Sequence, residues 1–499
     1  MNIRWSKAAR TVGWACVGVV AAAVAALIAA GSGLEPGAMA VSTAAVGAVA
    51  LVFVFRPAAG VGAFLVLVLF SHTYISPWPS TDVRFFDEIS VAFFVVASAL
   101  MNRARLARLR PSVKEGAIAT AIGAGILSSL LSSVPADTWI PGLLLLIKGI
   151  AFFYAVSWLR LEVAEVEGVG VLLLVVASIV LFLGFFEALD PVGFQRITRI
   201  QPSEEVRGGL RVVTSVFYHS SFFGWFTAYV SLFLFARFLV LRQWWALAAA
   251  VLLSVGTLIS GRRAPVVGVL AALGVGVVWS WSQRTSLRAM LRIVAPVAAT
   301  LLILAVVTAP VLSSFYARTV EEFGGGNLGE ILSPDPDPAA IAGAHPRMAL
   351  YVASLAIARD YFPLGAGLGR FGSYMSGANY SPLYERYGLV DVHGLRPNDP
   401  NAVSDTFWPM VLGELGPIGL AAFAAFVGLL LHRLWAVASR TASLPLRALA
   451  LGSLFVFVQG LVASLTAATY VAPPGYFIFG AAAAVWGLTR TEAPTLDNG

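Results

Sequence analysis

Long apolar runs constrain this chain more than any other feature of its sequence. Of its 499 residues, 59% are hydrophobic, whereas soluble domains have roughly 45–50%. The apolar residues form continuous runs, and a helix that crosses a bilayer needs roughly 20 of them. A soluble fold has no core large enough to bury so much apolar surface. The sequence therefore predicts an all-α, polytopic helical membrane protein with about 12–14 transmembrane helices.

Short polar connections set the limits of each predicted helix. The third and fourth runs are short for a span, and the last begins at the Pro473-Pro474 pair, so the predicted number of helices is a range. The candidate spans are Thr11–Ala30, Ala38–Phe55, Ala58–Phe70, Asp87–Met101, Gly116–Ser133, Pro141–Leu159, Gly168–Leu189, Val216–Leu241, Gln243–Ser260, Ala264–Trp281, Ile293–Ser313, Phe407–Leu431, Leu446–Leu465 and Pro473–Leu488.

Basic residues in the short loops predict the orientation of these helices, because Lys and Arg favour the cytoplasmic side. Met1–Arg10 is basic, and the apolar run after it is longer than the roughly 7–15 residues of a signal-peptide core. We interpret this run as a first membrane helix that starts in the cytoplasm. Alternate loops then hold most of the basic residues: Arg56, Arg103, Arg105, Arg108, Arg110, Lys114, Arg237, Arg242, Arg284, Arg288, Arg292, Arg433, Arg440 and Arg447. The pattern predicts that both termini are cytoplasmic.

One long segment, Ser314–Thr406, is too polar to lie in a bilayer, and the predicted orientation puts it on the outer face. It divides the chain into three parts: transmembrane helices in residues 1–313, a large outer loop in 314–406 that caps a site, and further helices with a short cytoplasmic tail in 407–499. Within the loop, Pro346–Asp360 predicts a short amphipathic helix, because proline suits the first helical position. Pro363–Gly372 contains four glycines and predicts a tight passage of the backbone.

Several classes of function are excluded by composition. Cys16 is the only cysteine, so the chain has no internal disulfide and no cysteine metal site. None of the five histidines has a partner at a metal-binding spacing, so we expect no metal and no cofactor. The net charge of +7 comes from arginines spread over many short loops. That distribution is typical of membrane topology and does not indicate a nucleic-acid partner.

Arginines in predicted outer loops oppose the usual charge bias. Arg211, Arg262, Arg263 and Arg347 all lie there. A guanidinium group binds phosphate oxygens through two donors and stays charged at low dielectric, so these residues are candidate ligands of a diphosphate. The alternative is that they snorkel or pair with Glu204, Glu205 or Glu414. We interpret three further arginines of the same region, Arg196, Arg199 and Arg207, as ordinary loop charges.

Acidic residues and histidines near this face are the candidate catalytic groups. Asp405 lies where the loop re-enters the membrane, and a partly desolvated carboxylate there can act as a general base. The alternative is that Ser404 or Asp405 caps the helix that starts near Phe407. Glu414 lies inside that helix, where a carboxylate marks either an ion pair or a site. The remaining candidates are His219, His345 and His393 at the outer face, and Lys148 and Glu187 within spans.

Four pieces of the chain stand in order around the large predicted loop. They are Arg211–Gly224 (RVVTSVFYHSSFFG), Ile259–Ala264 (ISGRRA), Arg347 followed by Tyr361–Gly367 (YFPLGAG), and Glu414–Leu420 (ELGPIGL). In order and spacing they resemble the O-antigen ligase and O-antigen polymerase superfamily of bacterial membrane glycosyltransferases. The first two resemble its outer segment that enters a helix and its short Gly-Ser-Arg-Gly turn. The last two resemble its arginine helix with the Pro-Leu-Gly-x-Gly passage and its Glu-x-Gly-x-x-Gly helix.

The resemblance implies a fold of many helices with a large periplasmic loop, in the bacterial cytoplasmic membrane. It implies a glycan donor linked to undecaprenyl diphosphate, held by Arg263 and Arg347, and by Arg211 less directly, without a metal. Ligases of the family have a His-Asn pair where this chain has Asp405 and Thr406. That difference suits a polymerase, or a ligase-like enzyme that uses Asp405 as its base; His393 or His345 are the substitutes.

The expected function is therefore a membrane glycosyltransferase of cell-surface polysaccharide assembly. It would polymerise or ligate undecaprenyl-diphosphate-linked oligosaccharide units on the outer face of the membrane. Its partners would be the lipid-linked donor, a glycan acceptor and membrane lipids. The alternative is a transporter or flippase of polysaccharide or lipid-linked sugar, with polar residues of several helices around a central cavity and repeat symmetry. A third class, a non-catalytic scaffold, would need no clustered arginines.

Overall fold

The structure is a computed structural model, and it describes residues 47–74, 86–106, 111–207, 210–283 and 344–492. Three predictions fall largely or wholly outside these ranges: the first two candidate spans, the span Ile293–Ser313, and the first part of the outer loop, 314–343. The positions of the two termini relative to the membrane also stay predictions.

The described residues are mainly helical, with one two-stranded antiparallel hairpin in which Val206 pairs with Arg211. Residues 47–55 are helical as well. The elements are α3 (Pro57–Tyr74), α4 (Phe86–Met101), α5 (Arg103–Leu106), α6 (Val113–Leu131), α7 (Ala136–Trp158), α8 (Val163–Leu189), α9 (Pro191–Thr198), β1 (Val206–Arg207), β2 (Leu210–Arg211), α10 (Ser220–Leu241), α11 (Trp244–Ile259), α12 (Arg263–Ser282), α17 (Pro346–Asp360), α18 (Tyr374–Ala378), α19 (Pro382–Arg386), α20 (Trp408–Arg440), α21 (Leu444–Ser464) and α22 (Pro474–Glu492).

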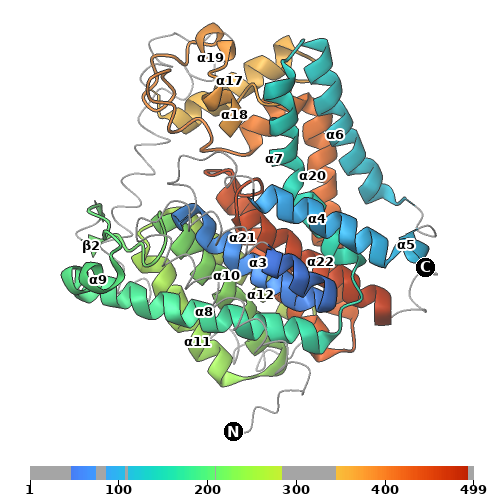
Figure 1. Cartoon of the computed structure of the whole chain (residues 1–499), viewed down its shortest axis with the longest axis vertical. Helices are drawn as coiled ribbons and strands as arrows, with labels where there is room; N and C mark the ends of the chain where they lie inside the picture. Colours follow the sequence, from blue (N-terminus) through green and yellow to red (C-terminus); the bar gives the residue numbers. More distant parts are fainter. Residues whose placement is uncertain (1–46, 75–85, 107–110, 208–209, 284–343, 493–499) are drawn as a thin grey trace.

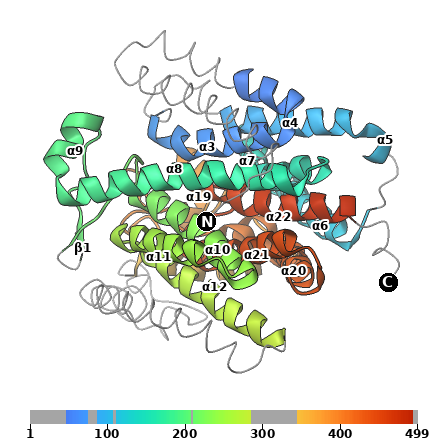
Figure 2. The same cartoon turned by 90° about the horizontal axis from the view of Figure 1, so that it is seen from below.

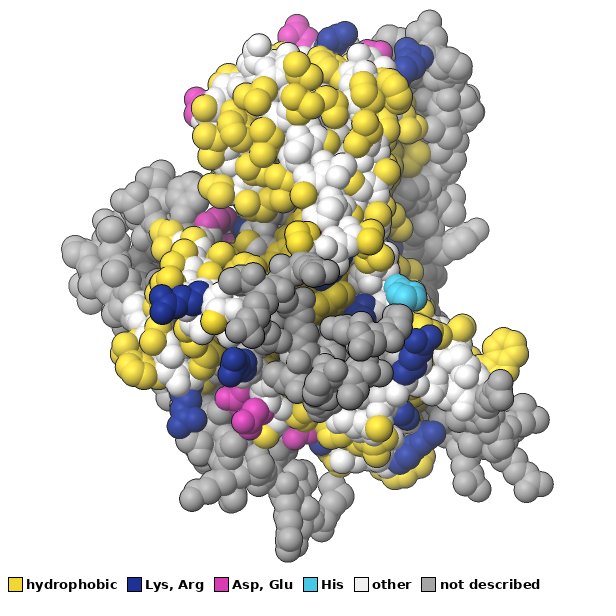
Figure 3. All heavy atoms as spheres, turned by 90° about the vertical axis from the view of Figure 1, so that its right-hand side faces the viewer, with side chains coloured by type: hydrophobic (Ala, Val, Ile, Leu, Met, Phe, Trp, Pro, Cys, Tyr) yellow, Lys and Arg dark blue, Asp and Glu magenta, His cyan; other side chains and the backbone are white. Residues whose placement is uncertain are grey.

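Seven of the described helices are long and apolar enough to cross a membrane: α6, α7, α8, α10, α12, α20 and α21. Shorter apolar helices lie within α3, α11 and α22. These helices confirm the prediction of a polytopic helical membrane protein. Figure 3 shows a face on which hydrophobic side chains cover most of the described upper part, while charged side chains gather at its top and in its lower part.

The helices form two groups that meet along α21 and α22, because α20 packs on α21 and α7 packs on α22 (Figure 1). In one group α6, α7 and α20 run side by side, and α20 packs closely on α6. In the other, α10 packs on α11 and α21, and α12 packs on α21. Figure 2 shows α8 passing between α3 and α10, both of which it contacts.

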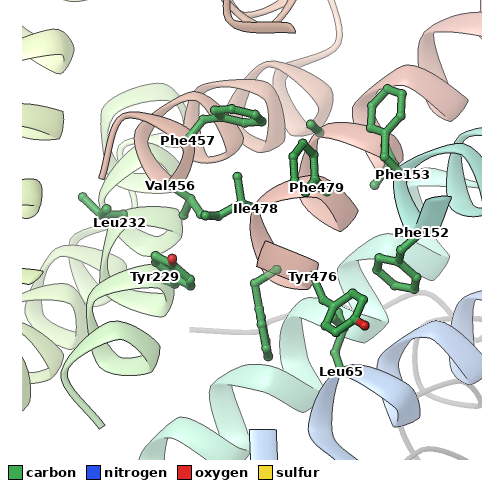
Figure 4. Packing of buried hydrophobic residues seen from close by; sticks show 14 of the residues in the cluster. Leu65, Phe152, Phe153, Tyr229, Leu232, Val456, Phe457, Tyr476, Ile478 and Phe479 are labelled. Atoms are coloured by element: carbon green, nitrogen blue, oxygen red, sulfur yellow. The ribbon is translucent and has the colours of Figure 1, made fainter. Parts of the chain in front are cut away.

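Large buried side chains join the two groups (Figure 4). Phe479 of α22 lies against Phe457 of α21, with ring centroids 5.8 Å apart. On the same helix, Tyr476 packs edge-on against Phe152 of α7 at 5.5 Å. Full burial of such side chains contributes roughly 1.5–3 kcal/mol each in water, but in a bilayer it is close packing rather than water exclusion that favours these contacts.

Residues 344–406, which we call the cap, have a small hydrophobic core of their own. Leu350 and Ile357 of α17 are fully buried against Phe371, Tyr384 and other apolar side chains of the cap. The predicted helix Pro346–Asp360 is confirmed, since α17 has those bounds. In Figure 1, α17, α18 and α19 lie beside the upper ends of α6, α7 and α20.

Helix α20 is broken at Gly416, and the cap forms hydrogen bonds with the backbone at this break. Gly416 has φ 70° and ψ −175°, a conformation open almost only to glycine. The next residue, Pro417, has no N–H, so the carbonyl of Gly413 lacks its helical partner. Ala366 of the glycine passage donates its N–H to that carbonyl at 2.8 Å, and Gly367 donates to the carbonyl of Glu414 at 3.2 Å.

We expect Gly416→Ala to destabilise the protein by about 1–3 kcal/mol or more, from backbone strain alone. A Cβ at this position would also lie 2.5 Å from the Gly365 nitrogen, inside van der Waals contact. Thermal unfolding in detergent measures the effect. The matched control is Gly428→Ala in the same helix, where an added Cβ meets no atom within 4 Å. Equal melting temperatures for the two variants would contradict the proposed role of the break.

Candidate functional site

A group of basic residues lies at the starts of helices α10, α12 and α17. The N-cap residues of these helices are His219, Arg262 and His345. One Arg262 nitrogen, Nη2, lies 2.9 Å from His219 Nε2, and Arg262 is close enough to Arg347 and Asp405 for their charges to shift its pKa. The start of a helix carries partial positive charge, which adds to that of the arginines. This arrangement favours an anion.

Arg262 is held by partners from two segments. Its Nε donates to Ser220 Oγ at 2.6 Å, and its Nη2 lies 3.1 Å from a carboxylate oxygen of Glu205. Burial and the nearby Arg207 lower the pKa of Arg262 to about 10. The guanidinium therefore stays charged at neutral pH and can still bind an anion.

The hairpin β1–β2 contributes Arg207 to this cluster. Arg207 pairs with Glu205, and its Nη1 donates to the carbonyl of Gly261 at 3.1 Å. Arg207 thus links the hairpin to the segment before α12, a contact that its interpretation as an ordinary loop charge did not include. A usable signal was present, because a Gly-Gly pair between Arg207 and Leu210 is typical of a tight hairpin.

Glu187 of α8 anchors the segment that carries the hairpin. It is 1% exposed, accepts from the Thr214 N–H at 3.0 Å and from the Thr214 hydroxyl at 3.2 Å, and also accepts from the Ser215 N–H. Its position in a span made Glu187 a functional candidate, and its contacts are those of a residue that positions a loop. Lys148, the other such candidate, is ion-paired with Asp87 at 2.9 Å and with Glu88 at 2.8 Å.

Arg347 and Asp405 form an ion pair across the cap, with a nitrogen-to-oxygen distance of 3.0 Å. Burial raises the pKa of the Asp405 carboxyl, and the charge of Arg347 opposes that shift. The alternative role of Ser404 or Asp405 as a helix cap is wrong, because Phe407 is the N-cap of α20 and no side chain caps it. Asp405 faces the arginines instead.

His219 lies against Arg262 in the cluster. Burial and the charge of Arg262 lower the pKa of its imidazole to about 4, so the ring is neutral at neutral pH. Its Nδ1 accepts from the Ser221 N–H at 3.2 Å, and its Nε2 lies 2.9 Å from Arg262 Nη2. The ring therefore helps to hold the guanidinium in place.

The structure thus brings together five of the predicted residues: Arg262, Arg347, Asp405, His219 and His345. Arg263 is the first residue of α12 and is half-buried. Arg211 is exposed on β2 and donates to the carbonyl of Ser203 at 2.6 Å. The side chain of His393 is 86% exposed and lies 3.8 Å from Asp399.

Glu414 lies apart from this cluster, buried beneath the glycine passage. It is 2% exposed, and its Oε1 accepts from the Phe371 N–H at 3.1 Å. The passage is held from the other side by α6, where Ser129 Oγ accepts from the Leu368 N–H at 2.9 Å. These contacts give Glu414 a positioning role in the cap.

Within the part of the chain that the structure describes, no group of three or more His, Cys, Asp or Glu side chains lies close enough to hold a metal ion.

No family model matches the chain, and no curated protein matches it at a significant level. The resemblance to the O-antigen ligase and polymerase superfamily therefore stays a prediction that rests on the four sequence motifs.

We expect Glu187→Ala to loosen the hairpin segment, because the N–H groups of Thr214 and Ser215 would lose their buried acceptor, at a cost of about 1–3 kcal/mol. Trypsin cuts after arginine, so cleavage at Arg207 and Arg211 should become about tenfold faster. Ser178→Ala, at an exposed site of the same helix, is the control. Unchanged cleavage in Glu187→Ala would show that other contacts hold the segment.

The pKa of His219 predicts a dependence of stability on pH. The folded-state pKa of about 4 lies below the ordinary value of 6.5, so the folded protein prefers the neutral ring. The contribution of His219 is complete above pH 6.5 and is lost as the pH falls toward about 4. Melting temperatures of wild type and His219→Asn should therefore differ in slope over this interval. Parallel curves would contradict the buried, neutral state.

Proposed function

We propose that this protein is a membrane glycosyltransferase that transfers a glycan from a lipid-linked diphosphate to an acceptor hydroxyl. The observation that carries the proposal is the position of Arg262 and Arg347 near the carboxylate of Asp405, with His219 beside Arg262. Guanidinium groups suit a diphosphate, and the partial positive charge of helix starts favours the same ligand. A carboxylate next to them suits the deprotonation of an alcohol.

In the proposed reaction, the acceptor hydroxyl attacks the anomeric carbon of the donor glycan. The new glycosidic C–O bond forms as the bond between that carbon and the diphosphate oxygen breaks. Asp405 takes the hydroxyl proton, and the diphosphate leaves with the electron pair. Arg262 and Arg347 stabilise the charge on the leaving group.

The Arg347–Asp405 pair suits two roles: Arg347 binds the diphosphate, and Asp405 accepts the proton of the acceptor hydroxyl. In the free protein the guanidinium lies 3.0 Å from the carboxylate and opposes the rise in its pKa. When the diphosphate binds, Arg347 turns to the phosphate oxygens. The carboxylate then loses its counter-ion, so its pKa rises and it becomes a stronger base.

The family resemblance adds detail to the same proposal. On that basis the donor lipid is undecaprenyl diphosphate, the reaction is polymerisation or ligation of surface glycan, and the site faces away from the cytoplasm. Within this proposal Glu414 positions the cap and takes no part in the chemistry. The proposed partners are the lipid-linked oligosaccharide, the acceptor glycan and the surrounding lipids.

Substitution of Asp405 and of the two arginines tests the proposal. In vesicles supplied with a polyprenyl-diphosphate oligosaccharide, we expect Asp405→Asn to slow glycan transfer by about 10²–10⁴-fold, the usual contribution of a general base. Arg347→Gln and Arg262→Gln should each slow it by about 10²–10³-fold, as expected for loss of a donor to the developing charge. Long glycan chains should disappear in cells that carry these variants.

Arg396→Gln is the matched control, because Arg396 lies on the cap and donates to the carbonyl of Asp391. It should retain transfer. Wild-type transfer in both Arg347→Gln and Asp405→Asn would refute the assignment. If wild-type vesicles move the lipid-linked glycan across the bilayer without forming a new glycosidic bond, the transporter alternative would replace it.

A further inference from the structure

A second site of a different kind lies at the other end of α10. A cavity of about 210 Å³ opens between α8 on one side and α3, α10, α21 and α22 on the other. Its lining includes Arg237, which is 17 residues after Ser220 of the anion cluster. At a rise of 1.5 Å per residue, these two positions are about 26 Å apart along the helix. The cavity is therefore separate from the proposed diphosphate site.

The lining of the cavity is almost entirely hydrocarbon. Its charged members are Glu167 and Arg237, which pair at 3.3 Å. Representative apolar members, contributed by four different helices, are Leu65, Val169, Leu173, Leu234 and Ala481. A buried water needs two to four polar partners, and these side chains provide none.

The space is large enough for part of a hydrocarbon chain. An engineered apolar cavity of roughly 150 Å³ already binds benzene, and this one is larger. Gly170 of α8 lines it, and a Cβ built on Gly170 meets no atom within 4 Å. The cavity is therefore open beside Gly170. Because the chain is a membrane protein, the molecules available to fill the cavity are lipids.

Polar groups gather at the Arg237 end of the cavity. Nε of Arg237 donates to Gln243 Oε1 at 2.7 Å, and its guanidinium lies 5.9 Å from the ring centre of Trp245. Arg242, the C-cap of α10, is a second basic residue at the same end of the helix. Arginine and tryptophan at the ends of spans are typical of the level of lipid head groups.

We propose that this cavity binds one acyl chain of a membrane phospholipid, with the lipid phosphate at Arg237. The chain fills the space between α8 and the packed helices α10, α21 and α22. The phosphate meets the positive charge at the mouth. A lipid held in this way links α8 to the rest of the molecule. The proposal does not depend on glycosyl transfer, because its test measures binding and melting.

The test is native mass spectrometry of the purified, delipidated full chain with added phosphatidylglycerol. We expect the wild type to retain one lipid, and Gly170→Phe to bind it at least tenfold more weakly, because the new ring occupies the cavity. Gly274→Phe is the matched control: Gly274 is also a helical glycine with open space around it, but it does not line the cavity. The added lipid should raise the melting temperature of wild type and of Gly274→Phe, and leave that of Gly170→Phe unchanged.

A second comparison tests the phosphate contact. Arg237→Gln should weaken phosphatidylglycerol binding several-fold and leave binding of diacylglycerol, which has no phosphate, unaltered. Three results would overturn the proposal: no lipid retained by the wild type, because detergent or the chain itself fills the space; equal retention by wild type and Gly170→Phe; or equal loss of both lipids in Arg237→Gln.

Discussion

A bilayer supplies no hydrogen-bond partners, so every non-helical backbone segment at membrane depth must be satisfied by the protein itself. This constraint explains two buried glutamates that sit in spans without a basic partner in the contacts described above. Glu187 of α8 accepts from the N–H groups of Thr214 and Ser215. Glu414 of α20 accepts from the N–H of Phe371. Each one fixes a loop that leads to the anion cluster.

The two glutamates act on opposite sides of the same cluster. The segment held by Glu187 carries the hairpin, whose Arg207 reaches the Gly261 carbonyl and whose neighbour Glu205 reaches Arg262. The passage held by Glu414 follows directly after α17, the helix of Arg347. The arginines themselves lie at helix starts, where a small change of loop position would move them by ångströms. Rigid anchoring of the loops is therefore a condition for a defined anion site.

The carboxylates that face the arginines do not exclude an anionic ligand. Glu205 and Asp405 have 37% and 41% of their side-chain surface exposed. Partly exposed ion pairs are worth about 0–1 kcal/mol, whereas a diphosphate offers several charged oxygens at once. When a diphosphate displaces these two weak ion pairs, it gains charge-assisted hydrogen bonds to the arginines. The alternative of simple pairing, which the sequence left open for Glu205, is thus present in the structure and compatible with the proposed function.

Much of the fold could be predicted, because hydropathy follows directly from the bilayer. The bounds of α17 and the tight passage after it came from local signals, proline at a first helical position and closely spaced glycines. The predicted start points were less accurate. The predicted span began at Pro141, whereas α7 begins at Ala136, because a proline in the second turn leaves this helix intact. The break at Gly416 was not predicted. It depends on a partner segment some fifty residues earlier in the chain, which no local pattern reveals.

The site was harder to predict than the fold for a geometric reason. Arg262 and Arg263 are neighbours in sequence, and the family motif pointed to Arg263. The contact with His219 is made by Arg262, the N-cap of α12, and it depends on a segment about forty residues earlier in the chain. Spacing along the chain likewise could not distinguish Arg207 from Arg211. Arg211 pairs with Val206 and Arg207 with Leu210, and successive pairs of a hairpin lie on opposite faces, so the register decides which arginine faces the cluster. The motifs pointed to the loops that carry the candidate residues. The position of each loop depends on a buried glutamate in a helix remote in sequence, Glu187 of α8 for the hairpin and Glu414 of α20 for the glycine passage.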